Sequence, residues 1–190
     1  MCPQKYLDLS LFSGHRISGC GCMQLPKSTN LKISTQKISV QGPFLEKADF
    51  CEPILHALPE WFGIEEANQD YLDAIDRLPT FLALSREPER VIGFLTIYRH
   101  FPTAAEIYVA GVHPDYHRRG WGRALLQAAE AYLRKQGIEY LQVKTLSPSN
   151  PDLGYAQTRA FYLAMGFTPL EEFKSLWNEN NPALLLIKKL

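Results

Sequence analysis

The sequence predicts an α/β fold with a central sheet of mixed, mostly antiparallel strands flanked by helices. Seven short segments have the length and composition of strands, and four longer segments repeat their apolar residues with a helical period. The order is β-α-α-β-β-β-α-β-α-β-β. Short turns join the three consecutive strands, which indicates an antiparallel meander in that part of the sheet.

The first two predicted elements are a strand and a helix. Residues 31–40, LKISTQKISV, alternate between apolar and polar side chains, as a half-buried strand does. Residues 49–58 favour a helix with Asp49 as the N-cap and Glu52 three residues later, which is a capping-box pattern. Pro59 would end this helix. Its apolar face would consist of Phe50, Ile54 and Leu58.

A second helix and the meander follow. Residues 65–79 are predicted to be helical, and a proline ends them. The apolar residues of this helix at the required spacing are Tyr71, Leu72, Ile75 and Leu78. The strands of the meander are expected at 80–85, 91–98 and 104–112.

The pattern changes to a helical period after the meander. A helix is predicted from Trp121 until Gly137, with apolar or small residues on one face at 121, 124, 125, 128 and 132. A second helix is expected at 155–165, closed by Gly166. The remaining strands are expected at 138–146, 167–173 and 183–190.

Composition limits the partners of the chain. Twenty basic residues balance twenty acidic ones, which argues against nucleic-acid binding. No apolar run is long enough to span a membrane. We expect one domain at residues 31–190, and a disordered N-terminal extension at residues 1–30. A monomer or a homodimer would suit such a domain.

The cysteines and histidines do not predict a disulfide framework or a metal site. Three of the four cysteines lie in the first 22 residues, so a reducing, cytoplasmic location is expected. Cys20 and Cys22 lack a second ligand pair at zinc spacing. Pro114 disfavours one continuous helix across His113 and His117, so these two rings would not share a helical face. No metal is therefore expected.

The stretch HPDYHRRGWGRALLQAAEAYL, residues 113–133, combines glycines, arginines and the start of a helix. Helix starts present unpaired backbone N–H groups, and glycines let a bulky anion approach them. A bound pyrophosphate is the simplest ligand. A dinucleotide-binding turn would need a third glycine where Leu125 stands, and a P-loop would need Gly-Lys-Ser/Thr. Both are therefore excluded, although a chance glycine-arginine string stays possible at this point.

HRRGWGRALL resembles the pyrophosphate loop of the GNAT superfamily of N-acetyltransferases, whose pattern is Gln/Arg-x-x-Gly-x-Gly/Ala. VHPDYHRRGWG and FYLAMGF are also typical of that family, and the resemblance spans roughly residues 31–190. It implies acetyl-CoA as the cosubstrate. His117 departs from the usual Gln or Arg, but the position contributes mainly its backbone. The implied loop contacts are His117, Arg118, Arg119, Gly120, Trp121, Gly122 and Arg123.

The resemblance also implies an opening in the sheet. In the family, the strand before the loop bulges and separates from its neighbour, and the pantetheine arm lies in the slot. Gly111 suits such a bulge. The backbone of Val112 would then bind the thioester carbonyl.

Glu106 and Tyr162 are the candidate catalytic residues. Glu106 is the only charge in the strand AAEIYVAGV, where burial of a carboxylate is costly, although an outward-facing glutamate would also explain it. The resemblance implies that Glu106, fourteen residues before Gly120, is the general base, acting through water. It implies that Tyr162 protonates the CoA thiolate. A tyrosine at helical spacing is otherwise a core residue.

The acceptor would be an amine of a small molecule or a peptide. In the family, the first two helices build much of the acceptor pocket, which makes Trp61, Phe62 and Tyr71 candidate contacts. These aromatic residues could equally form a packed corner between the helices. A non-catalytic acyl-CoA-binding module of the same fold is the alternative function.

Overall fold

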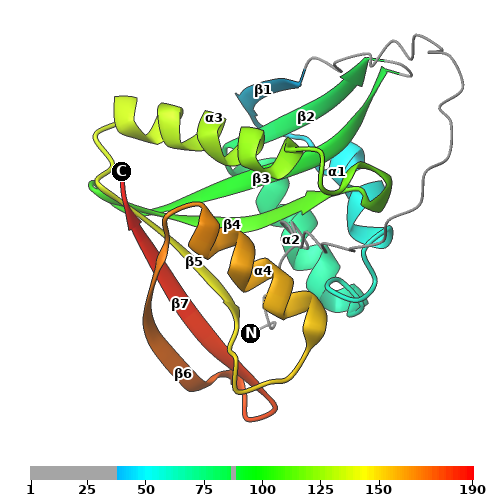
Figure 1. Ribbon diagram of the computed structural model, residues 1–190. Helices are drawn as coiled ribbons and strands as arrows, with labels where there is room; N and C mark the ends of the chain where they lie inside the picture. The colour runs from blue at the N-terminus through cyan, green and yellow to red at the C-terminus, as the bar shows by residue number, and fades with distance from the viewer. Residues whose placement is uncertain (1–37, 87–88) are drawn as a thin grey trace, which may run out of the picture.

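The computed structural model describes residues 38–86 and 89–190 (Figure 1). The extension at residues 1–30 and most of the strand expected at 31–40 lie outside the described residues. The described chain begins with a strand that runs a few residues later than expected, β1 (Ser39–Phe44). The remaining elements follow the expected order, with one short 3₁₀ turn, η1 (Pro114–Tyr116), added after the meander.

The helices are α1 (Ala48–His56), α2 (Glu65–Arg77), α3 (Trp121–Lys135) and α4 (Leu153–Ala164). The further strands are β2 (Thr80–Arg86), β3 (Glu89–Phe101), β4 (Ala104–Val112), β5 (Tyr140–Leu146), β6 (Thr168–Asn178) and β7 (Asn181–Lys189). Together with β1, these strands form one sheet in the order β1-β2-β3-β4-β5-β7-β6. Only β4 and β5 pair in parallel, so the prediction of a mixed, mostly antiparallel sheet is confirmed.

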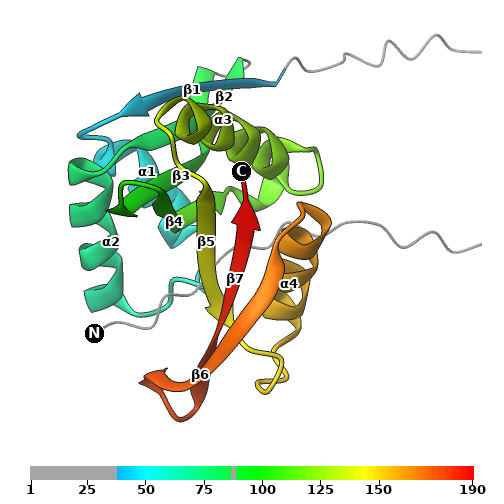
Figure 2. The ribbon, with the colours of Figure 1, turned by 90° about the vertical axis from the view of Figure 1, so that its left-hand side faces the viewer.

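Helices cover both faces of this sheet. In Figure 1, α3 crosses one face over β1 to β4, and α4 lies beside β5 on the same face. The helices α1 and α2 pack together on the opposite face, where α1 contacts β3 and β4. Figure 2 shows the β6–β7 hairpin reaching past α4 at the far end of the sheet. Each face of β4 therefore meets a different pair of helices.

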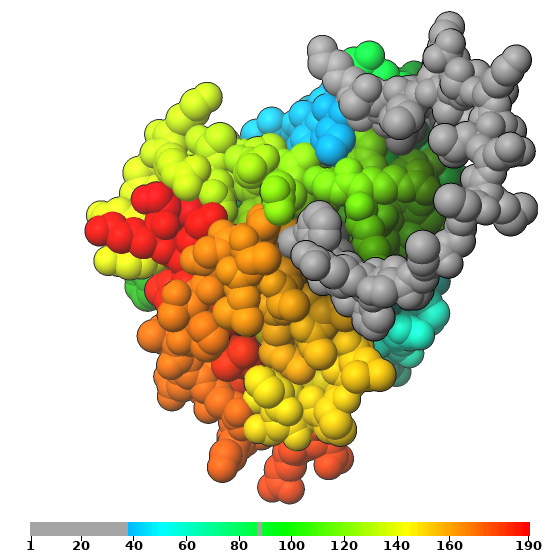
Figure 3. All heavy atoms as spheres, in the orientation of Figure 1, coloured from blue at the N-terminus to red at the C-terminus, as the bar shows by residue number. Residues whose placement is uncertain are grey.

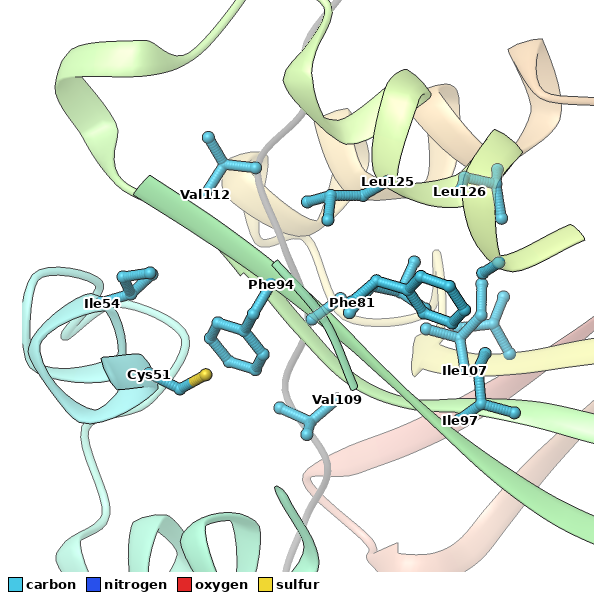
Figure 4. Close-up of a cluster of buried hydrophobic side chains, with 14 of the residues drawn as sticks. Cys51, Ile54, Phe81, Phe94, Ile97, Ile107, Val109, Val112, Leu125 and Leu126 are labelled. Atoms are coloured by element: carbon cyan, nitrogen blue, oxygen red, sulfur yellow. The ribbon is translucent and has the colours of Figure 1, made fainter. Parts of the chain in front are cut away.

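The hydrophobic core continues through the sheet. Figure 4 shows Val112 beside Leu125 of α3, while Cys51 and Ile54 of α1 lie near Phe94 on the other face. Burial raises the pKa of the Cys51 thiol, which keeps it protonated and unreactive. Among the described residues, no helix is both long and apolar enough to cross a membrane.

The sheet opens between β4 and β5, as predicted. These strands pair only from Ala104 to Glu106, after which β4 continues without β5 as its partner. The bulge was predicted at the wrong residue. Gly111 pairs regularly with Phe94, whereas Tyr108 is the extra residue between the partners of Thr96 and Ile97. A side chain at position 111 would press on Ile54 and Phe94, so close packing against α1 explains this glycine.

Two predictions for α1 are wrong. Lys47 occupies the N-cap position, and its own side chain does not cap the helix. Instead the Asp76 carboxylate of α2 accepts the Ala48 N–H at 2.8 Å, so a tertiary contact replaces the local capping box. Phe50 is 55% exposed, and the buried residues of α1 are Cys51, Ile54 and Leu55.

The buried face of α3 differs from the predicted one by about one residue position. Leu126, Ala129 and Leu133 are buried, whereas Ala128 and Tyr132 are only partly buried. The reason is that α3 packs on the sheet and also borders α4, so its buried stripe is wider than the sheet contact alone. The other predicted helices and the three strands of the meander are confirmed, and their ends differ by a few residues.

Candidate active site

The loop between β4 and α3 ends in a strained, open turn. Gly120 occupies the N-cap position of α3 with φ of 85°, and Arg118 has φ of 59°. No side chain caps the helix, and its first turn contains no acidic residue. Because the first N–H groups of a helix lack intrahelical partners, this end offers backbone donors to an anion.

The three arginines of the loop are exposed at this helix start. The guanidinium of Arg119 lies 5.6 Å from the ring centre of Tyr116 in η1. Arg90 of β3 donates to the Tyr116 hydroxyl at 3.0 Å, and this hydrogen bond lowers the pKa of that phenol. Tyr116 thus anchors the loop to the meander, and Arg118 and Arg123 add positive charge around the start of α3.

His117, the departure from the family pattern, has a structural contact. Its Nε2–H donates to the carbonyl oxygen of Val112 at 2.7 Å. The bond joins the end of β4 to the loop just before the helix start. The side chain of His117 therefore fixes the loop to the end of β4.

Tyr162 reaches across from α4 to the start of α3. Together with Val112 and Gly122 it lines a narrow apolar crevice between β3, β4 and α3. Burial raises the pKa of Tyr162, which keeps the phenol protonated at neutral pH. In Figure 3 the start of α3 and α4 adjoin on this face of the molecule. The structure thus brings together three residues that the sequence had placed in one site.

Two neighbouring aromatic residues are core residues. Trp121 is buried, so only its backbone faces the helix start. The ring of Tyr155 is buried, and its hydroxyl has no hydrogen-bond partner among the described residues. Burial raises the pKa of Tyr155 as well. Tyr155 is absent from the lining of the crevice that contains Tyr162.

Glu106 lies in a cluster of polar side chains on the other face of β4. Its Oε2 is 2.6 Å from Nζ of Lys144, 2.6 Å from Nε2 of His100 and 3.1 Å from Nε2 of Gln142. The Glu106 side chain is only 3% exposed, and its Oε1 has no partner among the described residues. The carboxylate is therefore partnered, as the burial cost predicted from the sequence requires.

The two candidate catalytic residues, Glu106 and Tyr162, lie on opposite faces of the sheet. Ile107 lines the crevice with Tyr162, so the preceding residue, Glu106, faces α2. Between them, β4 and β5 diverge directly after the pair Glu106 and Gln142. Glu106 and Tyr162 therefore lie on opposite faces of the sheet, beside this divergence.

The predicted acceptor residues are buried aromatics. Phe62 meets Tyr71 edge-on at 5.6 Å, and Tyr71 meets Tyr108 at 6.3 Å. Tyr108 continues to Tyr98 at 6.2 Å. Trp61 packs instead against Gly154 of α4, where an added Cβ would lie 2.9 Å from the indole. Phe62 and Tyr71 thus join a row of rings that leads to the Glu106 cluster, whereas the Trp61 indole packs against α4.

The sequence prediction missed His100, Gln142 and Lys144. The alternation in YLQVKTL could have indicated that Gln142 and Lys144 share one face of a strand. Nothing local to the sequence links that strand to Glu106, because the contact depends on the parallel pairing of β4 with β5. His100 is a bulged residue, so period-two alternation could not have oriented it.

A sheet that opens beside an anion-binding helix start is the architecture of acyl-CoA-dependent acyltransferases. The profile described as the acetyltransferase (GNAT) family matches residues 48–167, which covers most of the chain. The chain therefore belongs to the GNAT family of acetyltransferases. It is 31% identical over 83 residues to a mycothiol acetyltransferase from Actinosynnema mirum. That match covers 44% of this chain and 27% of the relative, so the chain spans only part of that protein's length.

Solved structures agree with this assignment at the level of the fold. A GNAT-family protein from Desulfovibrio desulfuricans matches with a TM-score of 0.68 and 17% identity, over 80% of this chain and 98% of its own. A GNAT acetyltransferase from Elizabethkingia anophelis, solved with acetyl-CoA bound, matches with a TM-score of 0.59 and 18% identity, over 80% and 98%. At these identities, the likeness concerns the arrangement of the elements.

Proposed function

We propose that the protein transfers an acetyl group from acetyl-CoA to a primary amine by direct attack. The observation that carries this proposal is the divergence of β4 from β5 directly after Glu106, with Tyr162 on one face and a polar cluster on the other. Acetyl-CoA supplies the thioester. The helix start at Gly120 and the exposed arginines suit its pyrophosphate, and the divergence of β4 from β5 offers a path for the arm that leads to the sulfur.

Each candidate residue has a chemical task in this proposal. The amine arrives as an ammonium and must lose a proton before it can attack. Glu106 is the carboxylate that promotes this loss, and it acts through an intervening group because its side chain is nearly inaccessible. Backbone groups near Val112 hold the thioester oxygen. Tyr162 protonates the leaving sulfur, for which a phenol that stays neutral is suited.

The acceptor class is an amine with an apolar or aromatic neighbourhood. The row of rings formed by Phe62, Tyr71, Tyr108 and Tyr98 leads to the Glu106 cluster. Rings of this kind attract ammonium groups and pack against apolar chains. The name of the relative from Actinosynnema mirum is consistent with an acceptor of low molecular mass, and a peptide amine is the other candidate.

Release of free thiol from acetyl-CoA tests the proposal. The purified full chain is incubated with acetyl-CoA and a panel of alkylamines, aromatic amines, peptides and aminoglycosides. Amine-dependent thiol release, with an acetylated product seen by mass spectrometry, would support transfer. Tight binding of acetyl-CoA without release for any amine would instead indicate a non-catalytic acyl-CoA sensor.

Replacing Tyr162 with phenylalanine is expected to lower kcat by about 10². The variant retains the buried ring, which packs edge-on against Phe161 and Phe167, and loses only the proton donor. Its affinity for acetyl-CoA should stay unchanged. Steady-state kinetics and isothermal titration calorimetry measure the two quantities.

Tyr155→Phe is the matched control, because it removes a buried hydroxyl from the same helix outside the crevice. Since that hydroxyl has no partner among the described residues, its loss should leave stability and kcat nearly unchanged. If Tyr162→Phe lowers the melting temperature while kcat is retained, Tyr162 serves packing and not proton transfer.

A further inference from the structure

The carboxylate of Glu106 is closed to direct contact with an acceptor. Its side chain is 3% exposed, and Oε2 already meets three nitrogen atoms, those of His100, Gln142 and Lys144. The His100 side chain is 31% exposed. Of the Glu106–His100 pair, the imidazole is thus the group that an amine on the α2 face can touch.

The position of His100 is set by an irregularity of the sheet. Arg99 pairs with Ala105 and Phe101 pairs with Ala104, so His100 is the extra residue of a bulge in β3. Bulges next to functional sites re-aim a side chain. Here the bulge brings the imidazole against Glu106 of the neighbouring strand. Tyr98 packs on the imidazole edge-to-face at 4.7 Å, which restrains its rotation.

We propose that His100 accepts the proton from the acceptor amine and that Glu106 acts as its positioning residue. This inference rests on the proposed function and replaces the intervening group of that mechanism with a named side chain. A carboxylate that orients and stabilises an imidazole is a general arrangement for base catalysis. Imidazole is also the side chain whose ordinary pKa lies nearest neutrality.

The contact between Glu106 and His100 selects one tautomer of the imidazole. Oε2 of an ionised carboxylate can only accept, so Nε2 of His100 carries the hydrogen at 2.6 Å. The Gln142 amide nitrogen also lies 3.2 Å from Nε2, and its N–H donates to Glu106 instead at 3.1 Å. Nδ1 of His100 then has a free lone pair, and no contact to it is found within residues 38–86 and 89–190. Proton uptake therefore occurs at Nδ1, and the resulting imidazolium keeps its bond to Glu106.

The neighbouring charges leave this cluster balanced before the reaction. Lys144 of β5 is 2.6 Å from Glu106 and neutralises the carboxylate. Tyr98 packs on the imidazole, and Tyr108 lies beyond Tyr98. The guanidinium of the preceding residue, Arg99, donates to the carbonyl oxygens of Phe101 and Pro102. A neutral cluster does not hold the acceptor as a fixed ion pair. It gains one positive charge only when His100 takes the proton.

The protons of the reaction balance on this scheme. The ammonium gives one proton to Nδ1 of His100, which passes it to solvent. The amine nitrogen forms a bond to the acetyl carbon while the carbon–sulfur bond breaks, and the sulfur takes the proton of Tyr162. The second proton of the nitrogen, released as the amide forms, restores the phenol. The products are one amide, one free thiol and one proton.

His100→Gln tests the proposal in the full chain, with the amine that gives the fastest thiol release in the panel. We expect kcat at saturating acceptor to fall by about 10² to 10³. The dependence of kcat on pH between about 5 and 8 should disappear with the imidazole. The affinity for acetyl-CoA should not change. His56→Gln is the matched control, because the exposed His56 ring pairs with a different glutamate, Glu65 at 3.7 Å. It should keep the wild-type rate.

Nitrogen NMR of the histidine-labelled wild-type protein provides a test that needs no variant. His100 should be the Nε2–H tautomer in the resting protein. An Nδ1–H tautomer would overturn the proposal, and so would a His100→Gln enzyme with the rate and pH profile of the wild type. In both cases the wild-type transfer activity would stand. If the wild-type chain binds acetyl-CoA but acetylates no amine, the proposed function falls and this inference falls with it.

Discussion

Replacing Glu106 with glutamine is expected to lower kcat by about 10² and to shift the pH optimum of transfer upward. Without the carboxylate, no negative charge stabilises the proton that leaves the acceptor. The variant then depends on amine that is already neutral, and that fraction grows with pH. A pH–rate profile with saturating acetyl-CoA measures both effects. Unchanged rates across the pH range would remove Glu106 from the mechanism.

The same substitution should also reduce stability, because it leaves a partly buried ammonium without its counter-ion. Removing one member of a buried ion pair costs about 3–5 kcal/mol. Lys144 retains 21% exposure and can turn toward water, so we expect a loss of about 2 kcal/mol in the free energy of unfolding. Denaturant unfolding of both proteins measures this loss.

Glu130→Gln separates the loss of stability from the loss of catalysis. Glu130 of α3 is the other buried glutamate of the described chain. Its carboxylate oxygens lie 2.5 Å from Nζ of Lys188 and 3.0 Å from the Arg134 guanidinium. Its removal disturbs a comparable cluster away from β4. We expect a similar loss of stability with kcat retained at saturating acetyl-CoA. Equal losses of kcat in the two variants would show that Glu106 acts through folding alone.

Where local signals decided the structure, the sequence predictions held. The prolines and glycines that end α2, α3 and α4 stand where the chain turns, and Gly137 and Gly166 have the positive φ that closes a helix. The capping box of α1 failed because Asp76, 28 residues from Ala48, supplies the cap instead. A local motif therefore predicts a helix start reliably only when no distant partner competes for the same N–H groups.

In the candidate site, too, local sequence signals predicted one part, and contacts between distant residues determine the other. The helix start at Gly120 followed from one continuous motif, and the family resemblance implied that Val112, Gly122 and Tyr162 belong to one site. The Glu106 cluster followed from neither, because its members come from three strands and meet only in the order β3, β4, β5. The single charge in a buried strand indicated that a partner exists. It could not indicate whether that partner is water, a ligand or Lys144.

Replacing Gly120 with valine is expected to weaken the binding of acetyl-CoA by about 100-fold, or about 2.8 kcal/mol. The backbone at this position has φ of 85°, which a β-branched residue adopts only with strain. Within the described residues, the nearest atom to an added Cβ is Cδ1 of Ile38 at 3.5 Å, which is an ordinary contact. The protein therefore has room for the Cβ, and the added methyl groups displace the anion that we expect against the first turn of α3.

Gly137→Val is the control for this strain. Gly137 follows the C-terminal end of the same helix with φ of 74°, and no atom of the described part of the chain lies within 4 Å of its added Cβ. Both substitutions force a valine into the left-handed region, so both should lower the free energy of unfolding by about 2 kcal/mol. Only Gly120→Val should change the calorimetric affinity for acetyl-CoA. Equal affinities in the two variants would place the pyrophosphate away from this helix start.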